Sequence, residues 1–168
     1  MLESILIGVA GFIGAMLLAS FAEWLVHILM HRRIFLGKVH RDHHAEGTGQ
    51  GWLKEFKDYY LPGLPAIIGL AVAMYFTGWY VLFGSMIGGA TFFAAFAAYA
   101  HQVQHQFPEM AVWMRRPVHY IHHHHKMWHN NYGISMDIWD RMFGTYKYVE
   151  WTPERKVQFR RFFQIRWI

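Results

Sequence analysis

Three long apolar blocks alternate with two polar regions along the chain. The first block, SILIGVAGFIGAMLLASFA at residues 4–22, carries no charged side chain, and its helical pattern continues to His31. A helix over residues 4–31 would be roughly 42 Å long, which exceeds the ~30 Å hydrocarbon core of a bilayer. The block therefore predicts a membrane span whose last turns stand clear of the acyl chains. Gly8, Gly11 and Gly14 indicate close packing against another helix.

The second uncharged stretch runs from residue 59 to residue 108 and divides at YFTGWY. Its halves predict spans at 61–76 and 79–104, joined as a hairpin. Pro62 and Pro65 lie near the start of the first half, where proline is tolerated in a helix. A re-entrant first half is the alternative, and either arrangement returns the chain to the same side. We expect an all-α integral membrane protein with about three transmembrane helices, forming a single domain over residues 1–168.

Composition supports a membrane protein. The chain is 54% hydrophobic and only 16% charged, which is too apolar for a typical soluble domain. It contains no cysteine, and this excludes disulfides, thiolate metal sites and cysteine nucleophiles. The first block lacks a basic N-terminal flank and an obvious cleavage site, which favours an uncleaved anchor over a signal peptide.

The basic residues predict the orientation in the membrane. All 16 Lys and Arg fall within residues 32–57 or 115–166. The positive-inside rule then makes 32–58 and 105–168 cytoplasmic, as a helical cap, and places the N-terminus across the membrane. Because the membrane explains the net charge of +5, we expect no nucleic acid partner. The tail VQFRRFFQIRWI at 157–168 predicts an interfacial helix on anionic lipid, or alternatively a partner-docking surface.

Histidine is concentrated on this one side in four motifs, HILMH at 27–31, HRDHH at 40–44, HQVQH at 101–105 and HYIHH at 119–123. Residues three or four apart share one helix face, so each motif can direct two imidazoles to one ion. The middle histidine of HxxHH is displaced around the helix and could reach a neighbouring ion. Ten imidazoles exceed the donors that one ion needs and predict two ions. The expected ligands are His27, His31, His40, His43, His44, His101, His105, His119, His122 and His123, with His124 and His129 as additional candidates.

Weaker interpretations were compared with this one. A single HxxxH in a helix is often no ligand pair, and a histidine near a membrane surface is often a polar tip among headgroups. Four such motifs on one side favour a dimetal centre. Neutral imidazoles suit Fe, Zn, Cu or Ni. Ligand softness alone does not choose among these metals. His125 lies outside the HxxHH face and is not expected to be a ligand.

Carboxylates near the motifs are the expected partners of the ring N–H groups. The candidates are Glu23, Asp42, Asp137 and Asp140. Glu23 is the strongest, because it precedes His27 by four residues and so lies on the same helix face. The alternative is an interfacial acid exposed to water.

Residues 23–146 resemble the fatty acid hydroxylase and sterol desaturase superfamily of membrane diiron oxygenases. The segments that carry the resemblance are EWLVHILMH, HRDHH, HQVQH, HYIHH and NNYGISMDIWDRMFGTY. The resemblance implies two Fe ions held by the histidines, since iron with open positions can reduce O2, and zinc is expected only as a substitute in purified protein. It also implies that O2 is a co-substrate and that two electrons are used to hydroxylate or desaturate a C–H bond of a lipid, such as a fatty acyl chain or a sterol-like lipid. The usual four-span core is reduced here to three spans. No electron-donor domain is recognisable, so a separate ferredoxin- or cytochrome b5-like donor is expected.

Two other functions are weighed against this expectation. The small carotenoid ring hydroxylases have similar length, although their usual sequences around the histidine pairs are not seen. A non-catalytic membrane metal-binding protein is the alternative from a different class. Metal transport is disfavoured, because the apolar blocks carry few polar residues that could pass an ion across the membrane.

Overall fold

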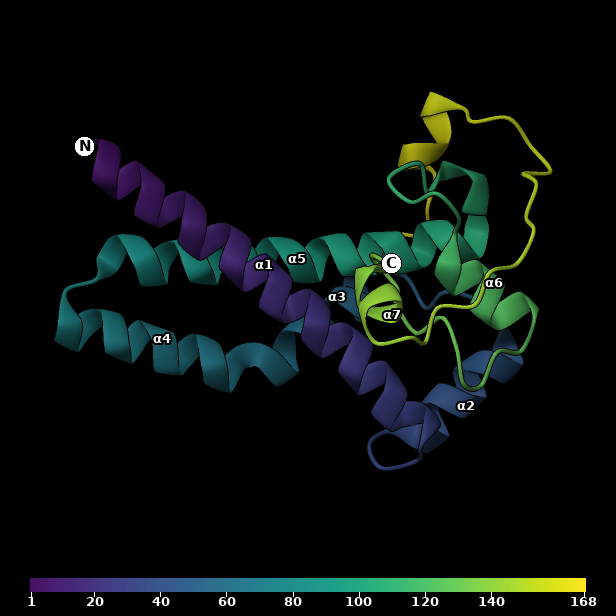
Figure 1. The fold of residues 1–168 in the computed structure, drawn as a ribbon, viewed down its shortest axis with the longest axis horizontal. Helices are drawn as coiled ribbons and strands as arrows, with labels where there is room; N and C mark the ends of the chain where they lie inside the picture. Colours follow the sequence, from purple (N-terminus) through teal and green to yellow (C-terminus); the bar gives the residue numbers. More distant parts are fainter.

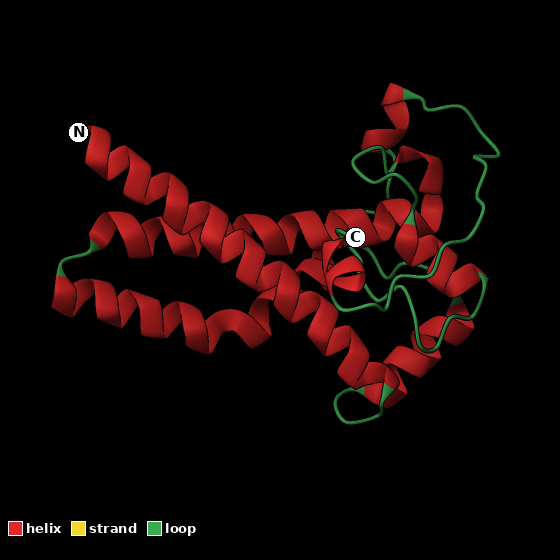
Figure 2. Cartoon of the chain, in the orientation of Figure 1, coloured by secondary structure: helices red, strands yellow, loops and turns green.

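The computed structural model describes residues 1–168 and is entirely helical, without strands (Figure 2). Three helical stretches are long and apolar enough to cross a membrane: Leu2–His31, Trp52–Thr77 and Tyr80–Gln106. The prediction of an all-α protein with three candidate spans is therefore confirmed. Figure 1 shows these helices extended toward the N-terminal end of the molecule, with the shorter helices gathered at the other end.

Helices α1 (Leu2–His31) and α5 (Tyr80–Gln106) form the main helix pair, and both run toward the shorter helices. Small residues allow the close approach. A Cβ added at Gly89 would lie 2.4 Å from the Phe12 carbonyl oxygen, and one at Gly11 would lie 2.4 Å from Ser85 Oγ. The contact expected at Gly11 is thus present, whereas a Cβ at Gly14 would meet nothing within 4 Å.

The helical stretch that contains the second predicted span begins before that span, at Trp52. Helix α3 (Trp52–Tyr60) leads through the 3-10 turn η1 (Leu61–Gly63) directly into α4 (Leu64–Thr77). Together they form the continuous candidate span Trp52–Thr77, so residues 52–58, predicted as part of the cap, belong to this helical stretch. The prolines do not interrupt it, because each lies at the first turn of its element. Gly78, with φ +70°, ends α4 and allows the predicted hairpin turn into α5.

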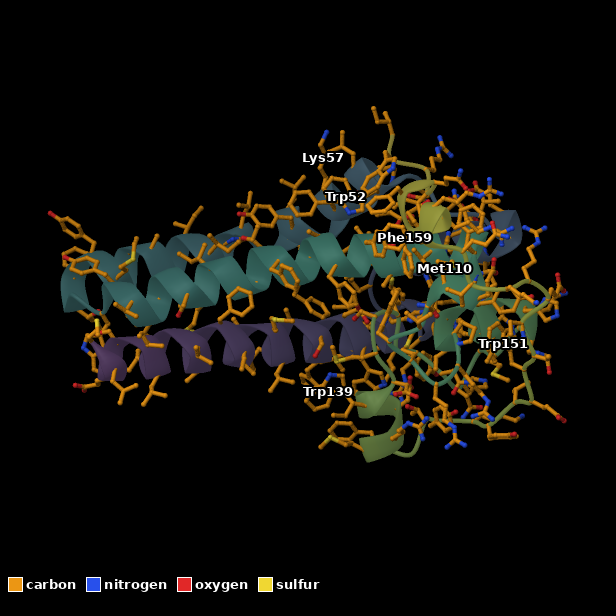
Figure 3. The ribbon with its side chains drawn as sticks, turned by 90° about the horizontal axis from the view of Figure 1, so that it is seen from above. Trp52, Lys57, Met110, Trp139, Trp151 and Phe159 are labelled. Atoms are coloured by element: carbon orange, nitrogen blue, oxygen red, sulfur yellow. The ribbon has the colours of Figure 1, made fainter.

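The cap consists of short helices connected by loops. Helix α2 (Gly37–Glu46) follows α1, while α6 (Val118–His124) and α7 (Ile138–Met142) follow α5 and the 3-10 turn η2 (Pro108–Met110). A small core of Val103, Met110, Ala111 and Ile165 lies beside the end of α5. Figure 3 shows Trp52, Met110 and Phe159 on one side of that helix end and Trp139 on the other, beside α1.

The C-terminal tail is not the continuous interfacial helix that its composition predicts. Only the 3-10 turn η3 (Phe159–Phe163) is helical. The carbonyls of Arg166 and Trp167 accept hydrogen bonds from the backbone N–H groups of Trp52 and Leu53, at 2.8 and 3.0 Å. The tail therefore caps the N-terminus of α3, where free N–H groups need acceptors.

Candidate metal centre

The histidines lie where the two parallel spans α1 and α5 end. His27 and His31 occupy the last turns of α1, and His101 and His105 occupy those of α5. Helix α2 supplies His40, His43 and His44, and α6 supplies His119, His122 and His123. Each of the four motifs is helical, as the expectation of shared helix faces requires.

Nine of these histidines form two groups whose ring nitrogens lie within 4.8 Å of one another. The first group, site A, contains His27, His31, His40, His44 and His122. The second group, site B, contains His43, His101, His105 and His119.

His123 lies beside both groups. Its ring is stacked on His44 with centroids 3.9 Å apart, and its centroid is 4.6 Å from those of His105 and His119. Both of its ring nitrogens are buried without a hydrogen-bond partner. His123, an expected ligand, is thus in neither group but has two buried nitrogens free to bind an ion beside site B.

The HxxHH motifs divide between the sites. His40 and His44 belong to site A while His43 between them reaches site B. In α6 the assignment is reversed, because His119 belongs to site B and His122 to site A. In each motif the middle histidine therefore belongs to the other site from the first one, so α2 and α6 each contribute to both sites.

The spacing of the donor atoms in site A suits a metal ion. His31 Nε2 lies 2.9 Å from both His40 Nε2 and His122 Nε2, and His44 Nε2 lies 3.0 Å from His40 Nε2. A metal bound at about 2.1 Å by two imidazoles at right angles would separate their nitrogens by about 3.0 Å. A tetrahedral set would place them about 3.4 Å apart. With 3.2 Å from His31 Nε2 to His27 Nε2 and from His122 Nε2 to His44 Nε2, the spacings range from the right-angle value toward the tetrahedral one and suit several imidazoles around one ion.

Backbone carbonyls determine which ring nitrogen of these histidines carries the proton. His122 Nδ1 lies 2.8 Å from the Asn130 carbonyl oxygen, and His27 Nδ1 contacts that of Tyr132. Because a carbonyl only accepts, both Nδ1 atoms must carry the proton, so both Nε2 atoms present lone pairs. These two lone pairs face the Nε2 atoms of His31, His40 and His44 at 2.9–3.2 Å, which is where one ion bound by the group would lie. The donor set therefore fits a metal ion, and the carbonyls hold the rings in the required tautomer.

Burial keeps the cap histidines neutral at physiological pH. Burial and the neighbouring imidazoles lower the pKa of His40 to about 2 and that of His43 to about 3. Burial likewise lowers the pKa of His44 to about 4 and that of His122 to about 3. Neutral imidazole is the form that binds a metal, so little proton competition is expected at neutral pH.

The loop at residues 130–135 is held against site A by two buried carboxylates. Asp140 accepts hydrogen bonds from the backbone N–H groups of Tyr132 and Gly133, at 2.9 and 2.7 Å, and from Trp24 Nε1 at 3.1 Å. Glu23 accepts from Ser135 Oγ at 2.7 Å and from Ile134 N at 2.9 Å.

None of the four carboxylates proposed from the sequence contacts a histidine ring. Glu23, expected to orient His27, instead binds the loop at Ile134 and Ser135, because that loop passes along the same face of α1. Asp140 also binds the loop, while Asp42 and Asp137 form exposed pairs with Lys38 and Arg141.

The carboxylate that does reach a histidine is Glu55, which the sequence pattern did not reveal. It is 5% exposed, and its Oε1 lies 2.8 Å from His101 Nδ1. The same oxygen accepts from Gln50 N at 2.8 Å and from the Gln102 side chain. The available signal was a lone acid between aromatic side chains, since Trp52 and Tyr59 share the helix face of Glu55.

Two further contacts support site B. Gly47, with φ +64°, ends α2 in the left-handed conformation, and its carbonyl oxygen lies 3.2 Å from His105 Nδ1. Gln104 Oε1 accepts from His119 N at 2.8 Å, which joins α5 to the start of α6.

The remaining histidines lie outside both groups. His124, His125 and His129 are exposed, and the His124 ring stacks on Tyr120 with centroids 5.3 Å apart. Neither additional candidate, His124 or His129, is brought to a metal group.

The fatty acid hydroxylase family model matches residues 12–145, which contain every histidine of sites A and B. The chain belongs to this family. Membership indicates an oxidoreductase of the lipid hydroxylase or desaturase type. No match was found among curated proteins or among solved structures.

Proposed function

We propose that this chain is a membrane diiron oxygenase that hydroxylates or desaturates a C–H bond of a lipid. The observation that carries the proposal is the convergence of ten histidines at the end of the apolar spans, in a member of the fatty acid hydroxylase family. Hydroxylation would follow R–H + O2 + 2 e⁻ + 2 H⁺ → R–OH + H2O. The two irons, when bound, would supply the reduction of O2.

The protein's own residues would hold and orient this centre. Site A would bind one ion through its five imidazoles and site B a second ion through its four, with His123 as an additional donor to site B. His43 and His122 would link the two halves. The carbonyls of Tyr132 and Asn130 keep the site A rings in one tautomer. Because the sites lie where α1 and α5 leave the predicted hydrocarbon core, a lipid chain could approach from the bilayer without entering water.

We further propose that the centre faces the cytoplasm and receives its electrons from a separate ferredoxin- or cytochrome b5-like protein. The clustering of all Lys and Arg in residues 32–57 and 115–166 supports this orientation.

Lipid and pigment mass spectrometry of cells with and without the protein, grown under 18O2, tests the function. Hydroxylation predicts an 18O-labelled acyl or sterol-like lipid, and desaturation predicts an unsaturated lipid without the label. A labelled carotenoid would instead favour the ring hydroxylases. No change in any lipid or pigment, in cells whose purified protein holds two irons, would contradict the proposal.

A further inference from the structure

Trp128 connects the protein surface to the predicted metal ligands of site A. Its side chain is 43% exposed, yet its ring lies 5.2 Å from that of His31 and 5.1 Å from that of His44, between centroids. Trp128 is thus an exposed aromatic side chain in contact with two histidines of site A. An aromatic ring so placed provides a short path between a partner at the surface and the centre.

The surface around Trp128 is basic and hollowed. A hollow of about 490 Å³ is lined by His125, Lys126, Met127, Trp128, His129, Asn130, Lys147 and Val149. The lining contains two lysines, two exposed histidines and no acid. An approaching acidic protein would therefore meet complementary charge here.

This surface is built from two segments that hydrogen bonds hold together. Asn131 Oδ1 accepts from Lys147 N at 2.8 Å, and Asn131 Nδ2 donates to the Lys147 carbonyl oxygen at 3.0 Å. Tyr132 Oη donates to the Trp128 carbonyl oxygen at 3.1 Å. The lysines and the tryptophan are thus fixed relative to the loop that orients His27 and His122, and little ordering is required on binding.

The neighbouring hollow on the cap is less suited to an acidic partner. It has a volume of about 450 Å³ and includes Glu109, Glu150 and Glu154 in its lining. These acids would repel a negatively charged protein.

The position of Trp128 relative to the bilayer also favours a soluble partner. His31 is the last residue of a 30-residue helix, which is about 45 Å long and so extends beyond a ~30 Å hydrocarbon core. Trp128, in contact with His31, lies at this protruding end.

We propose that the Trp128 surface, defined by Lys126, Trp128, His129 and Lys147, is the docking site of an acidic one-electron carrier protein, with Trp128 as the contact through which electrons reach His31 and His44. This inference rests on the proposed function, since a diiron oxygenase needs an external donor. Each encounter would oxidise the carrier by one electron and reduce the centre by one, so two encounters supply one turnover.

Binding can be measured without the metal, which separates this proposal from the function itself. The probes are a reduced [2Fe–2S] ferredoxin and a cytochrome b5 haem domain of acidic net charge, added to the full chain in zwitterionic nanodiscs. The test variant is Lys126→Glu/Lys147→Glu, and the control is Lys156→Glu/Arg160→Glu, which changes the net charge equally on exposed residues of the tail. We expect the test variant to weaken Kd at least tenfold at low salt and the control to leave it within about threefold.

Equal weakening by both pairs, or no binding of either probe to the wild-type protein, would overturn the docking site. Binding only in nanodiscs with anionic lipid, and lost on adding competing phosphate, would also overturn it by indicating a headgroup site. Intact binding without any lipid product would count against the proposed function alone.

Trp128→Leu tests the electron path separately from packing. With normal iron content, we expect reduction by the bound carrier to slow at least tenfold while reduction by dithionite, a small diffusible reductant, stays unchanged. Equal slowing with both reductants would show that Trp128 acts only by positioning His31 and His44.

Discussion

At the scale of single residues, the two predicted metal sites differ in what supports their histidines. The rings of site A contact neutral backbone carbonyls, whereas His101 in site B contacts the carboxylate of Glu55. A carboxylate on Nδ1 makes an imidazole a stronger donor and fixes its orientation. We therefore expect Glu55 to position His101 of site B.

Replacing Glu55 by glutamine should remove this support while keeping the side-chain size. We expect iron affinity at site B to fall about 10–100-fold, so that one of two ions is lost at moderate chelator concentration. Iron per chain across a chelator titration measures the effect. Asp58→Asn, an exposed acid on the same helix, is the control and should retain both ions. Retention of both ions in Glu55→Gln would show that the carboxylate contact is unimportant.

Within residues 119–125, we predict that His122 is a metal ligand and that His125 is not. His122 is fully buried and its Nε2 lies 2.9 Å from that of His31, whereas His125 is exposed. We expect His122→Ala to lose iron and lipid oxidation together, and His125→Ala to retain both. Iron per chain and product are measured on the same preparations. An inactive His125→Ala beside a tolerated His119→Ala would mean that the motif is shifted toward the C-terminus.

At the scale of helices, the site depends on the close crossing of α1 and α5, because these two helices carry four of the predicted ligands. Gly89 allows the contact, since a Cβ there would lie 2.4 Å from the Phe12 carbonyl oxygen. The backbone of Phe12 cannot move away from an added Cβ as the end of a flexible side chain could.

Gly89→Ala should separate the two helices and lower stability by about 1–3 kcal/mol, the usual cost of overpacking. Gly84→Ala on the same helix is the matched control, because a Cβ there meets nothing within 4 Å. Thermal unfolding in detergent measures both variants. Equal melting temperatures for Gly89→Ala and the wild type would show that α1 and α5 can separate without cost.

At the scale of the whole molecule, the histidines make the metal-free protein sensitive to acid. Burial lowers the pKa of His40 to about 2 and that of His122 to about 3. In the unfolded chain both would titrate near 6.5, so the unfolded state binds more protons below that pH. Stability is therefore retained above pH 6.5 and lost as the pH falls, by about 1.4 kcal/mol per pH unit for each imidazole that stays neutral.

Thermal unfolding of chelator-treated protein at pH 7.5 and pH 5 should show this loss, with a lower melting temperature at pH 5. Bound metal competes with the protons, so the iron-loaded protein should lose less. Equal melting temperatures of the metal-free protein at both pH values would contradict the burial of neutral histidines.

The proposed cytoplasmic position of the cap can be tested by cysteine labelling. Cysteines introduced at Lys38 and Arg155, in a chain without native cysteine, should resist an impermeant label added outside intact cells. Thr77→Cys, at the end of α4 away from the cap, should be labelled and serves as the positive control. Labelling at position 38 or 155 would reverse the proposed orientation.

Periodicity and spacing alone predicted three long apolar helices and the four histidine motifs. Long apolar blocks form helices because backbone groups in a bilayer must pair within their own segment, a constraint that is local in sequence. The i, i+4 spacing of His27 and His31, or of His101 and His105, places each pair on one face for the same local reason. The sequence pattern did not predict that the helix leading into α4 begins at Trp52, because α3 is amphipathic and carries charges that mask its continuity with α4.

The partners of the histidines were decided only by tertiary structure. His122 joins His31 across 91 residues, and Glu55 meets His101 across 46, so no local pattern encodes either pairing. Glu23 was correctly located on the His27 face, but its hydrogen bonds depend on where the 130–135 loop passes. Sequence by itself determined which side chains could bind metal and on which helix faces they lie. Packing of α2, α6 and the loops against the two spans determined which of them meet, because those contacts join segments that are distant along the chain.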